Sequence, residues 1–234
     1  ATRRSRFRVG GLLPRFRIPH GHAGRLHVAR HRSLFGPDVS RMRLRDYAGL
    51  VGAAARVQSD VLRRRAPLPY KLELILTYRC GSRCRTCNIW KRYEDHPEDE
   101  AAELTAEQWV SAVRSARDHV RWISFTGGEI TDREDLPEIV EGVCQAVGDR
   151  LNLIQFTTNG LDPERTERVF ARILEATRGI PTYVTMSLDG VGRDYDRVRG
   201  IRGGYGKVKA SMAALQRLKD QGASHLTTGF QITL

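Results

Sequence analysis

Three cysteines crowd into one short stretch of this 234-residue chain. Cys80, Cys84 and Cys87 lie within RCGSRCRTCNIW, residues 79–90, with the spacing C-x3-C-x2-C. Thiolates are ligands for soft metals and for iron–sulfur clusters. A structural zinc site needs four ligands, usually from two separated Cys or His pairs, and no second pair follows at such a spacing. The trio therefore predicts a metal centre with three protein ligands and one open position.

Two other residues are candidates for a fourth ligand, and neither fits well. His96 follows nine residues after Cys87, but it lies among acidic residues. Cys144, in EIVEGVCQAV, falls on the apolar side of a predicted helix, so we expect it to belong to the core. A [4Fe–4S] cubane normally takes four thiolates, and with three of them one iron stays free to bind another molecule. A partial zinc site is the alternative at this stage.

The elements that must position these cysteines alternate between strands and helices from residue 70 onward. The hydrophobic pattern predicts five strands, over residues 71–77, 122–128, 151–160, 182–190 and 225–234. It also predicts helices over 105–119, 136–147, 163–177 and 206–221, the first opened by a capping box at Thr105 and Gln108. Such alternation implies an α/β fold with parallel strands and right-handed crossovers.

Each of the first four strands ends in a polar or glycine-containing turn. These turns read TYRCGSRC, TGGE, TTNG and SLDG in chain order. Each one taken alone is an ordinary turn between a strand and a helix. In parallel α/β folds and barrels, however, the functional site lies at the carboxyl ends of the strands. We therefore expect the four turns, with the cysteine stretch among them, to meet at one rim.

The cysteine spacing directly after a first strand resembles the radical S-adenosylmethionine (radical SAM) superfamily, nearest its molybdenum-cofactor-type and peptide-maturing (SPASM) branch. The resemblance covers about residues 71–234. It implies a partial TIM barrel of the (β/α)6 type, and a [4Fe–4S] cluster on Cys80, Cys84 and Cys87 with SAM on the open iron. It also implies that the reduced cluster cleaves SAM to a 5′-deoxyadenosyl radical, which takes a hydrogen atom from the substrate.

Two downstream turns carry most of the implied SAM contacts. FTGGE, residues 125–129, is similar to the family's GGE motif, in which the backbone of Gly127 and Gly128 would approach the methionine amino group. Glu129 would accept a hydrogen bond from the same ammonium. SLDGVGRDYDRVRG is similar to the S-x-D-G…D-x-x-R pattern. That pattern implies a ribose contact at Ser187 and a pairing of Arg199 with the SAM carboxylate.

Other positions match the family less closely. Thr157 in TTNG corresponds to a SAM contact of molybdenum-cofactor-type members. Thr86 stands where the family often has an aromatic residue near adenine, so we expect Ile89 or Trp90 to supply that apolar contact. Tyr195 stands where relatives often have histidine.

Only five of the six strands of such a barrel can be counted, and the fifth reaches the last residue. We therefore expect this chain to be a fragment whose sixth strand, and any domain with auxiliary clusters, lie beyond residue 234. Without a neighbour, the fifth strand would be an exposed edge.

Residues 1–69 differ in charge from the expected core at 70–234. Residues 1–70 hold 16 Arg, no Lys and three Asp, a charge of +13, whereas the remainder carries −1. We expect an Arg-rich extension with an amphipathic helix at about 44–65, ended by Pro67 and Pro69. Contact with nucleic acid or an anionic surface is one interpretation, and a solvated extension is the favoured one. The acidic stretch 93–103 is likewise expected to be a solvated loop.

No apolar run approaches the length of a membrane span, and the basic first residues lack the apolar stretch of a secretory signal. Clustered cysteines without a disulfide framework are typical of a reducing cytoplasm. The predicted function is a radical SAM enzyme that acts on a peptide or complex small molecule and takes electrons from a flavodoxin- or ferredoxin-like donor. The pattern singles out no substrate-side acid, base or radical relay.

Two alternatives are kept. One is a non-catalytic binding module, stabilised by zinc or by a cluster, with a basic arm that contacts nucleic acid. The other is a degenerate family member that binds SAM without performing chemistry.

Overall fold

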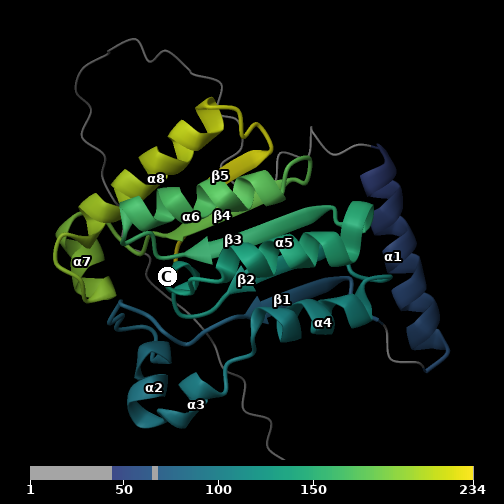
Figure 1. The fold of residues 1–234 in the computed structure, drawn as a ribbon, viewed down its shortest axis with the longest axis horizontal. Coiled ribbons are helices and arrows are strands. Elements are labelled where there is room, and N and C mark those ends of the chain that lie inside the picture. The colour runs from purple at the N-terminus through teal and green to yellow at the C-terminus, as the bar shows by residue number, and fades with distance from the viewer. Residues whose placement is uncertain (1–43, 65–67, 234) are drawn as a thin grey trace, which may run out of the picture. The chain divides into compact units, whose positions relative to one another are not determined.

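The computed structural model describes residues 44–64 and 68–233 (Figure 1). One sheet of parallel strands runs in the order β1-β2-β3-β4-β5, the order of the chain itself. The bounds are β1 Lys71–Ile75, β2 Trp122–Thr126, β3 Leu153–Thr158, β4 Thr182–Ser187 and β5 Leu226–Gln231. A helix follows each of the first four strands, so the predicted α/β class, with five strands of a partial (β/α) barrel, is confirmed.

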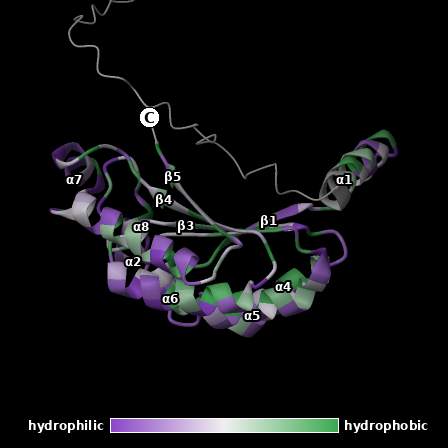
Figure 2. Ribbon diagram, turned by 90° about the horizontal axis from the view of Figure 1, so that it is seen from above, coloured by the Kyte–Doolittle hydropathy of each residue, from purple (hydrophilic) through white to green (hydrophobic). Residues whose placement is uncertain are grey.

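The helices lie mainly on one face of this sheet. Four of them, α4 Ala106–Ala116, α5 Leu136–Val147, α6 Pro163–Ala176 and α8 Gly204–Asp220, cover that face in Figure 2. The remaining helices are α1 Leu44–Leu62, α2 Arg92–Asp95, α3 Glu98–Ala101 and α7 Arg193–Arg199. Three 3-10 turns complete the described elements: η2 Ile89–Lys91, η3 Ile130–Asp132 and η4 Gly148–Arg150.

Local sequence explains where the larger helices begin. The Thr105 side chain accepts from the backbone N–H of Gln108, and the Gln108 side chain accepts from that of Thr105, so the predicted capping box is present. Asp162 caps α6, and Pro163 occupies its first turn, where a missing N–H costs nothing. The predicted helices are confirmed, α5 with the bounds expected. The predicted strands extend too far at their carboxyl ends, because the chain there leaves the sheet to form the site loops.

The core lies between the sheet and the covering helices. Phe125 of β2 stacks on Phe156 of β3 with ring centroids 5.1 Å apart, and Phe170 of α6 meets Phe156 edge-on at 5.4 Å. All three rings are fully buried. Cys144 belongs to this core as predicted, and burial raises the pKa of its thiol to about 12. Apolar contact of this kind holds the strands, and hence their carboxyl ends, in fixed register.

The opposite face of the sheet is polar. Along each strand, residues alternate between the two faces. The residues on either side of each buried aromatic residue therefore point away from the helices. This set includes Ser124, Gln155, Thr157 and Thr185, and Thr157 pairs in register with Thr185. A parallel sheet with one polar face needs something to cover or solvate that face, as the inside of a barrel does when it holds a ligand.

One expectation about a loop is wrong, one helix was not predicted, and part of the expected N-terminal extension lies outside the described residues. The acidic stretch 93–103 is not a plain solvated loop, because it forms most of α2 and α3. Helix α7 was not predicted at all. The helix expected at 44–65 is confirmed as α1, whereas the arm at 1–43 lies outside the described residues, so the division at residue 69 stays a prediction. Within 44–64 and 68–233, no helix is long and apolar enough to cross a membrane.

Truncating Phe156 tests the core that sets the strand positions. We expect Phe156→Ala to lower the free energy of unfolding by about 3–5 kcal/mol, because it removes contacts with two rings and leaves a cavity. Urea unfolding monitored by circular dichroism gives this value. The conservative change Phe156→Leu should cost clearly less, and equal losses for the two variants would contradict the packing described.

Candidate functional site

The predicted ligand cysteines lie on the loop that connects β1 to η2. Cys80 is half-buried, Cys84 is buried and Cys87 is exposed, and none is in a disulfide. The loop folds back on itself, since Arg83 Nη1 donates to the Cys80 carbonyl at 2.9 Å and Trp90 Nε1 donates to the Cys87 carbonyl at 3.0 Å. Burial raises the pKa of the Cys80 thiol, so binding of a metal there must expel a proton that the thiol holds firmly.

Helices α2 and α3 pair with this loop, which explains why residues 93–103 are ordered. Arg79 forms an ion pair with Glu100 at 2.6 Å, and Arg83 forms one with Glu94 at 3.3 Å. Tyr93 Oη accepts from the backbone N–H of Tyr78 at 3.1 Å. The acidic residues therefore neutralise the arginines of the cysteine loop, an arrangement that a count of charges along the sequence does not show.

The glycines after β2 allow two backbones to approach closely. Gly128 N donates to the Thr77 carbonyl at 2.8 Å, and Glu129 N donates to the Arg79 carbonyl at 2.7 Å. A Cβ at Gly127 would lie 2.5 Å from Thr77 O, and one at Gly128 would lie 2.2 Å from Arg79 O. Both distances are too short for any side chain, so these glycines position the segment that leads into the cysteines. Their contact with SAM stays a prediction.

Glu129 joins the end of β2 to the end of β3. Its carboxylate, only 3% exposed, accepts from the backbone and hydroxyl of Thr131 at 3.0 and 2.7 Å and from the Thr158 hydroxyl at 2.7 Å. Its second oxygen accepts from the backbone N–H of Asn159 at 2.7 Å. Burial raises the pKa of Glu129, and these four donors oppose that effect. The residue therefore has a bracing role beside the predicted contact with the SAM ammonium.

Asn159 is a site residue that the sequence analysis missed. Its Oδ1 accepts from the backbone N–H of Leu161 at 2.9 Å, and its Nδ2 donates to Ser82 Oγ at 3.3 Å and to Cys80 Sγ at 3.9 Å. The sequence TTNG predicts the turn that Asn159 forms. No local pattern indicates that its amide reaches a residue 79 positions earlier.

Helix α7 attaches the cysteine loop from the other side. The backbone N–H groups of Arg83 and Arg85 donate to the carbonyls of Arg199 and Val198 at 3.1 and 2.9 Å. The helix ends at Gly200, which has φ +67° and would place a Cβ 2.4 Å from Arg83 O. A glycine at this position both ends the helix and admits the loop. That C-terminal glycine was the available sequence indication of α7.

The Arg199 side chain, 11% exposed, points at the cysteine loop. Its Nη1 donates to Cys84 Sγ at 3.2 Å, and its Nε lies 3.1 Å from Asp189 Oδ2 as an ion pair. Asp189, in the SLDG turn, is 5% exposed and was not singled out by the sequence analysis. Arg199 thus contacts a predicted cluster ligand directly, while its pairing with the SAM carboxylate stays a prediction.

Thr157 and Ser187 lie on the sheet next to this cluster of contacts. Thr157 Oγ1 is 3.3 Å from Thr185 Oγ1 on the polar face of the sheet. Ser187 is the last residue of β4 and pairs in register with Gln231 of β5. Among the described residues, no hydrogen bond joins either hydroxyl to the cysteine loop. The structure therefore links Cys80, Cys84, Glu129 and Arg199 by contacts, but not these two residues, whose SAM contacts stay predictions.

The donors of the site fit the implied cofactors. Within the described residues, the buried Tyr195 Oη has no hydrogen-bond partner, whereas Arg199 Nε is in the ion pair with Asp189. Burial raises the pKa of Tyr195 to about 12, so its phenol remains a hydrogen-bond donor at neutral pH. A buried donor without a partner suits a polar ligand group, and three free thiols on one loop suit a cluster.

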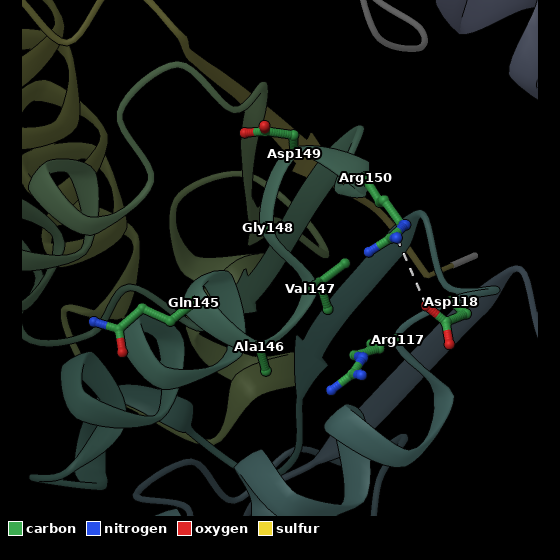
Figure 3. A pocket seen from close by; sticks show the side chains of 8 residues that line it. All are labelled: Arg117, Asp118, Gln145, Ala146, Val147, Gly148, Asp149 and Arg150. Carbon is green, nitrogen blue, oxygen red and sulfur yellow. Dashed lines mark ion pairs between the residues drawn. The ribbon is translucent and has the colours of Figure 1, made fainter.

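Two hollows on the protein surface include none of the predicted cluster ligands. A hollow of about 610 Å³ lies between the ends of α4 and α5, with the ion pair of Arg150 and Asp118 at its edge (Figure 3). It is at the amino ends of the strands, opposite the site. A second hollow of about 440 Å³ adjoins the cysteine loop at Tyr78, Ile89 and Lys91. In the described part of the chain, no three His, Cys, Asp or Glu side chains gather closely enough to hold one metal ion.

Comparison with protein families agrees with the arrangement of these residues. The family described as the radical SAM superfamily matches residues 74–233. The chain belongs to the radical SAM superfamily. Members are enzymes that use a [4Fe–4S] cluster and SAM, so the predicted family, enzyme class and cofactors are confirmed. The assignment of individual ligands within this radical SAM domain stays a prediction.

Named relatives cover only part of the chain. GTP 3′,8-cyclase 3 of Mycobacterium bovis is 31% identical over 136 residues, which are 56% of this chain and 35% of the cyclase. The sporulation killing factor maturation protein SkfB of Bacillus subtilis is 29% identical over 154 residues, 65% of this chain and 33% of SkfB. This radical SAM chain thus spans about a third of the length of the curated relatives it matches.

A solved structure titled native anSMEcpe with bound AdoMet and Kp18Cys peptide is also similar. It is 20% identical, the match covers 69% of this chain and 42% of the other, and the TM-score is 0.48.

Substituting Gly200 tests the attachment of the cysteine loop. We expect Gly200→Ala to reduce the iron and sulfide retained per chain after anaerobic reconstitution, because a Cβ would push the Arg83 carbonyl and strain a positive φ. Colorimetric iron and sulfide assays provide the measurement. Gly206→Ala is the matched control, since nothing lies within 4 Å of its Cβ, and equal iron content in both variants would refute the docking of the loop on α7.

Substituting Glu129 tests whether its carboxylate stabilises the contact between the ends of β2 and β3. We expect Glu129→Gln to lower the free energy of unfolding at pH 7 by about 1–3 kcal/mol, because an amide NH₂ replaces an acceptor and faces a buried backbone donor. The pKa of Glu129 is raised in the folded protein, so the folded state binds its proton more tightly than the unfolded state. Glu129 therefore makes stability fall as pH rises above its ordinary pKa of 4.5, and the variant should lose this slope.

Denaturant unfolding of the apoprotein between pH 4.5 and 8 measures both effects. Glu138→Gln is the control, because Glu138 pairs with Arg172 on the surface. A Glu129 variant as stable as this control would show that the carboxylate is not needed as a brace.

Proposed function

We propose that this protein is a radical SAM enzyme that cleaves SAM reductively at a [4Fe–4S] cluster held by Cys80, Cys84 and Cys87. The cluster, once bound and reduced, supplies the electron that turns SAM into methionine and a 5′-deoxyadenosyl radical, which removes a hydrogen atom from the substrate. Family membership supports the cofactors, and the cysteine loop supports their place. The proposal concerns the activity of the whole protein.

One observation carries this proposal: the cysteine loop is attached to two separate strand ends that also carry the predicted SAM contacts. Gly128 and Glu129 bind the start of the loop, and Arg199 binds its middle through Cys84. A cluster on these thiols and SAM on the facing turns would lie side by side, which supports the proposal. That geometry is what electron transfer from the cluster to SAM requires.

The chain's own residues would bind and orient the two cofactors. Arg199, with a planar guanidinium, suits a carboxylate, and Tyr195 has a free buried hydroxyl close to it. Ser187 and Thr157 would offer hydroxyls to SAM from the polar face of the sheet. Trp90 is fixed beside Cys87 and stacks with Arg83 at 4.7 Å, which supports it over the exposed Thr86 as the residue next to adenine.

We propose a peptide as the substrate, with the electron supplied by an external flavodoxin- or ferredoxin-like donor. SkfB is named as a maturation protein, and its match covers more of this chain than that of the cyclase. GTP 3′,8-cyclase 3 supports a second candidate, a complex small molecule such as a nucleotide. A binding module depends on the basic arm, most of which lies outside the described residues, and no observation favours it.

Removing one thiol tests the cluster and the cleavage of SAM together. We expect the intact protein, reconstituted anaerobically and reduced with dithionite, to form 5′-deoxyadenosine from SAM. Cys84→Ala should lose both cluster iron and product. Cys144→Ala is the matched control, because Cys144 lies in the core and not on the loop, so it should retain iron. Zinc in place of iron and sulfide, or product formation by Cys84→Ala, would overturn the proposal.

Transfer of deuterium distinguishes the two substrate classes. A perdeuterated peptide mixture and deuterated GTP are each incubated with the reduced enzyme and SAM, and 5′-deoxyadenosine is examined by mass spectrometry. Deuterium from the peptides alone is the expected result. Deuterium from GTP alone would replace the peptide by the small-molecule candidate, and deuterium from neither would reject both classes.

A further inference from the structure

Each predicted ligand sulfur accepts at least one N–H group, and two of these groups come from other parts of the fold. The pairs are Arg199 Nη1 to Cys84 Sγ at 3.2 Å, Ile89 N to Cys87 Sγ at 3.5 Å and Asn159 Nδ2 to Cys80 Sγ at 3.9 Å. Two of the three are side chains from distant segments, 115 and 79 residues away along the chain. The tertiary fold, and not the local structure of the cysteine loop, therefore brings these two side chains to the sulfur atoms.

The structure holds the Arg199 guanidinium against Cys84. Asp189 Oδ2 lies 3.1 Å from Arg199 Nε, and Asp189 Oδ1 accepts from the backbone N–H of Thr233 at 2.8 Å. The Arg199 carbonyl also accepts from the backbone of Arg83, within the cysteine loop. Backbone and side chain of Arg199 are thus fixed at once, so the cation stays beside the sulfur.

Asn159 is fixed in a similar way at Cys80. Its backbone N–H binds the Glu129 carboxylate, and its Oδ1 is occupied by the backbone N–H of Leu161. The orientation of the amide is therefore set, and its Nδ2 points at Ser82 and Cys80. An amide nitrogen carries two hydrogens, which is one for each of these acceptors.

We propose that Arg199 and Asn159 are positioning residues that raise the reduction potential of the cluster by donating N–H groups to Cys84 and Cys80. This inference rests on the proposed function, since it requires the cluster to bind these thiols. Reduction adds one negative charge, and hydrogen bonds to sulfur and nearby positive charge favour the reduced form. The effect is strongest at the buried Cys84, where solvent screens little.

This role is separable from the predicted pairing of Arg199 with the SAM carboxylate. A residue that only binds SAM changes the affinity for SAM and leaves the potential of the SAM-free cluster unchanged. A residue that donates to Cys84 changes that potential whether or not SAM is present. The deciding measurement is therefore made on reconstituted protein without SAM.

The test is a redox titration of the intact, reconstituted protein followed by electron paramagnetic resonance. We expect Arg199→Gln to lower the potential by about 59 mV or more, the equivalent of a tenfold change in the equilibrium of a one-electron couple. Asn159→Asp, which keeps the acceptor for Leu161 but replaces the donor by a negative charge, should also lower it. Arg197→Gln is the control, because Arg197 is an exposed residue of α7 paired with Asp194.

The outcomes separate this inference from the proposed function. Unchanged potentials in Arg199→Gln and Asn159→Asp, with weaker SAM binding by Arg199→Gln, would overturn the inference and leave the function intact. If Arg199→Gln fails to retain the cluster, Asn159→Asp decides alone, and an unchanged or higher potential there refutes the proposal. Wild-type protein that forms no iron–sulfur cluster would instead refute the proposed function.

Discussion

The arrangement of the site depends on one buried carboxylate, that of Glu129. An ionisable group inside a protein is tolerated only when hydrogen bonds replace the water it has lost. Glu129 receives four such bonds, from Thr131, Thr158 and Asn159. These donors lie at the ends of the neighbouring strands β2 and β3, so the hydrogen bonds to the carboxylate connect the two strand ends. Asn159, held in this way, reaches back to Cys80, and the brace extends to the predicted metal ligands.

Close backbone contacts also hold the cysteine loop in place. Gly128 lets the turn after β2 approach Arg79, and Gly200 lets the end of α7 approach Arg83. The cysteine loop is therefore in backbone contact with both the turn after β2 and the end of α7. The ion pairs of α2 and α3 add contacts along its outer edge. A cluster ligand set needs this kind of support, because groups outside the ligands decide how the ligands are oriented and how the metal behaves.

Many features of this radical SAM chain followed from residue patterns. Alternating strands and helices, the capping box at Thr105 and the core position of Cys144 were all predictable, because each depends on local periodicity or on capping chemistry. Helix α7 was missed because only seven residues lie between its two glycines, too few for a periodic pattern. Residues 93–103 were misjudged because Glu94 and Glu100 pair with Arg83 and Arg79 of the cysteine loop, contacts that the local sequence does not indicate.

The sequence by itself determined the types of the predicted ligands, their spacing and the order of the turns, and these sufficed for the family and its cofactors. Only the tertiary structure decided which residues contact the predicted ligands: Arg199 at Cys84, Asn159 at Cys80 and Asp189 behind Arg199. The physical reason is distance along the chain. Parallel strands bring together segments separated by whole helices, and the contacts made at their ends depend on side-chain packing and on backbone approach within a few tenths of an ångström, neither of which any local pattern encodes.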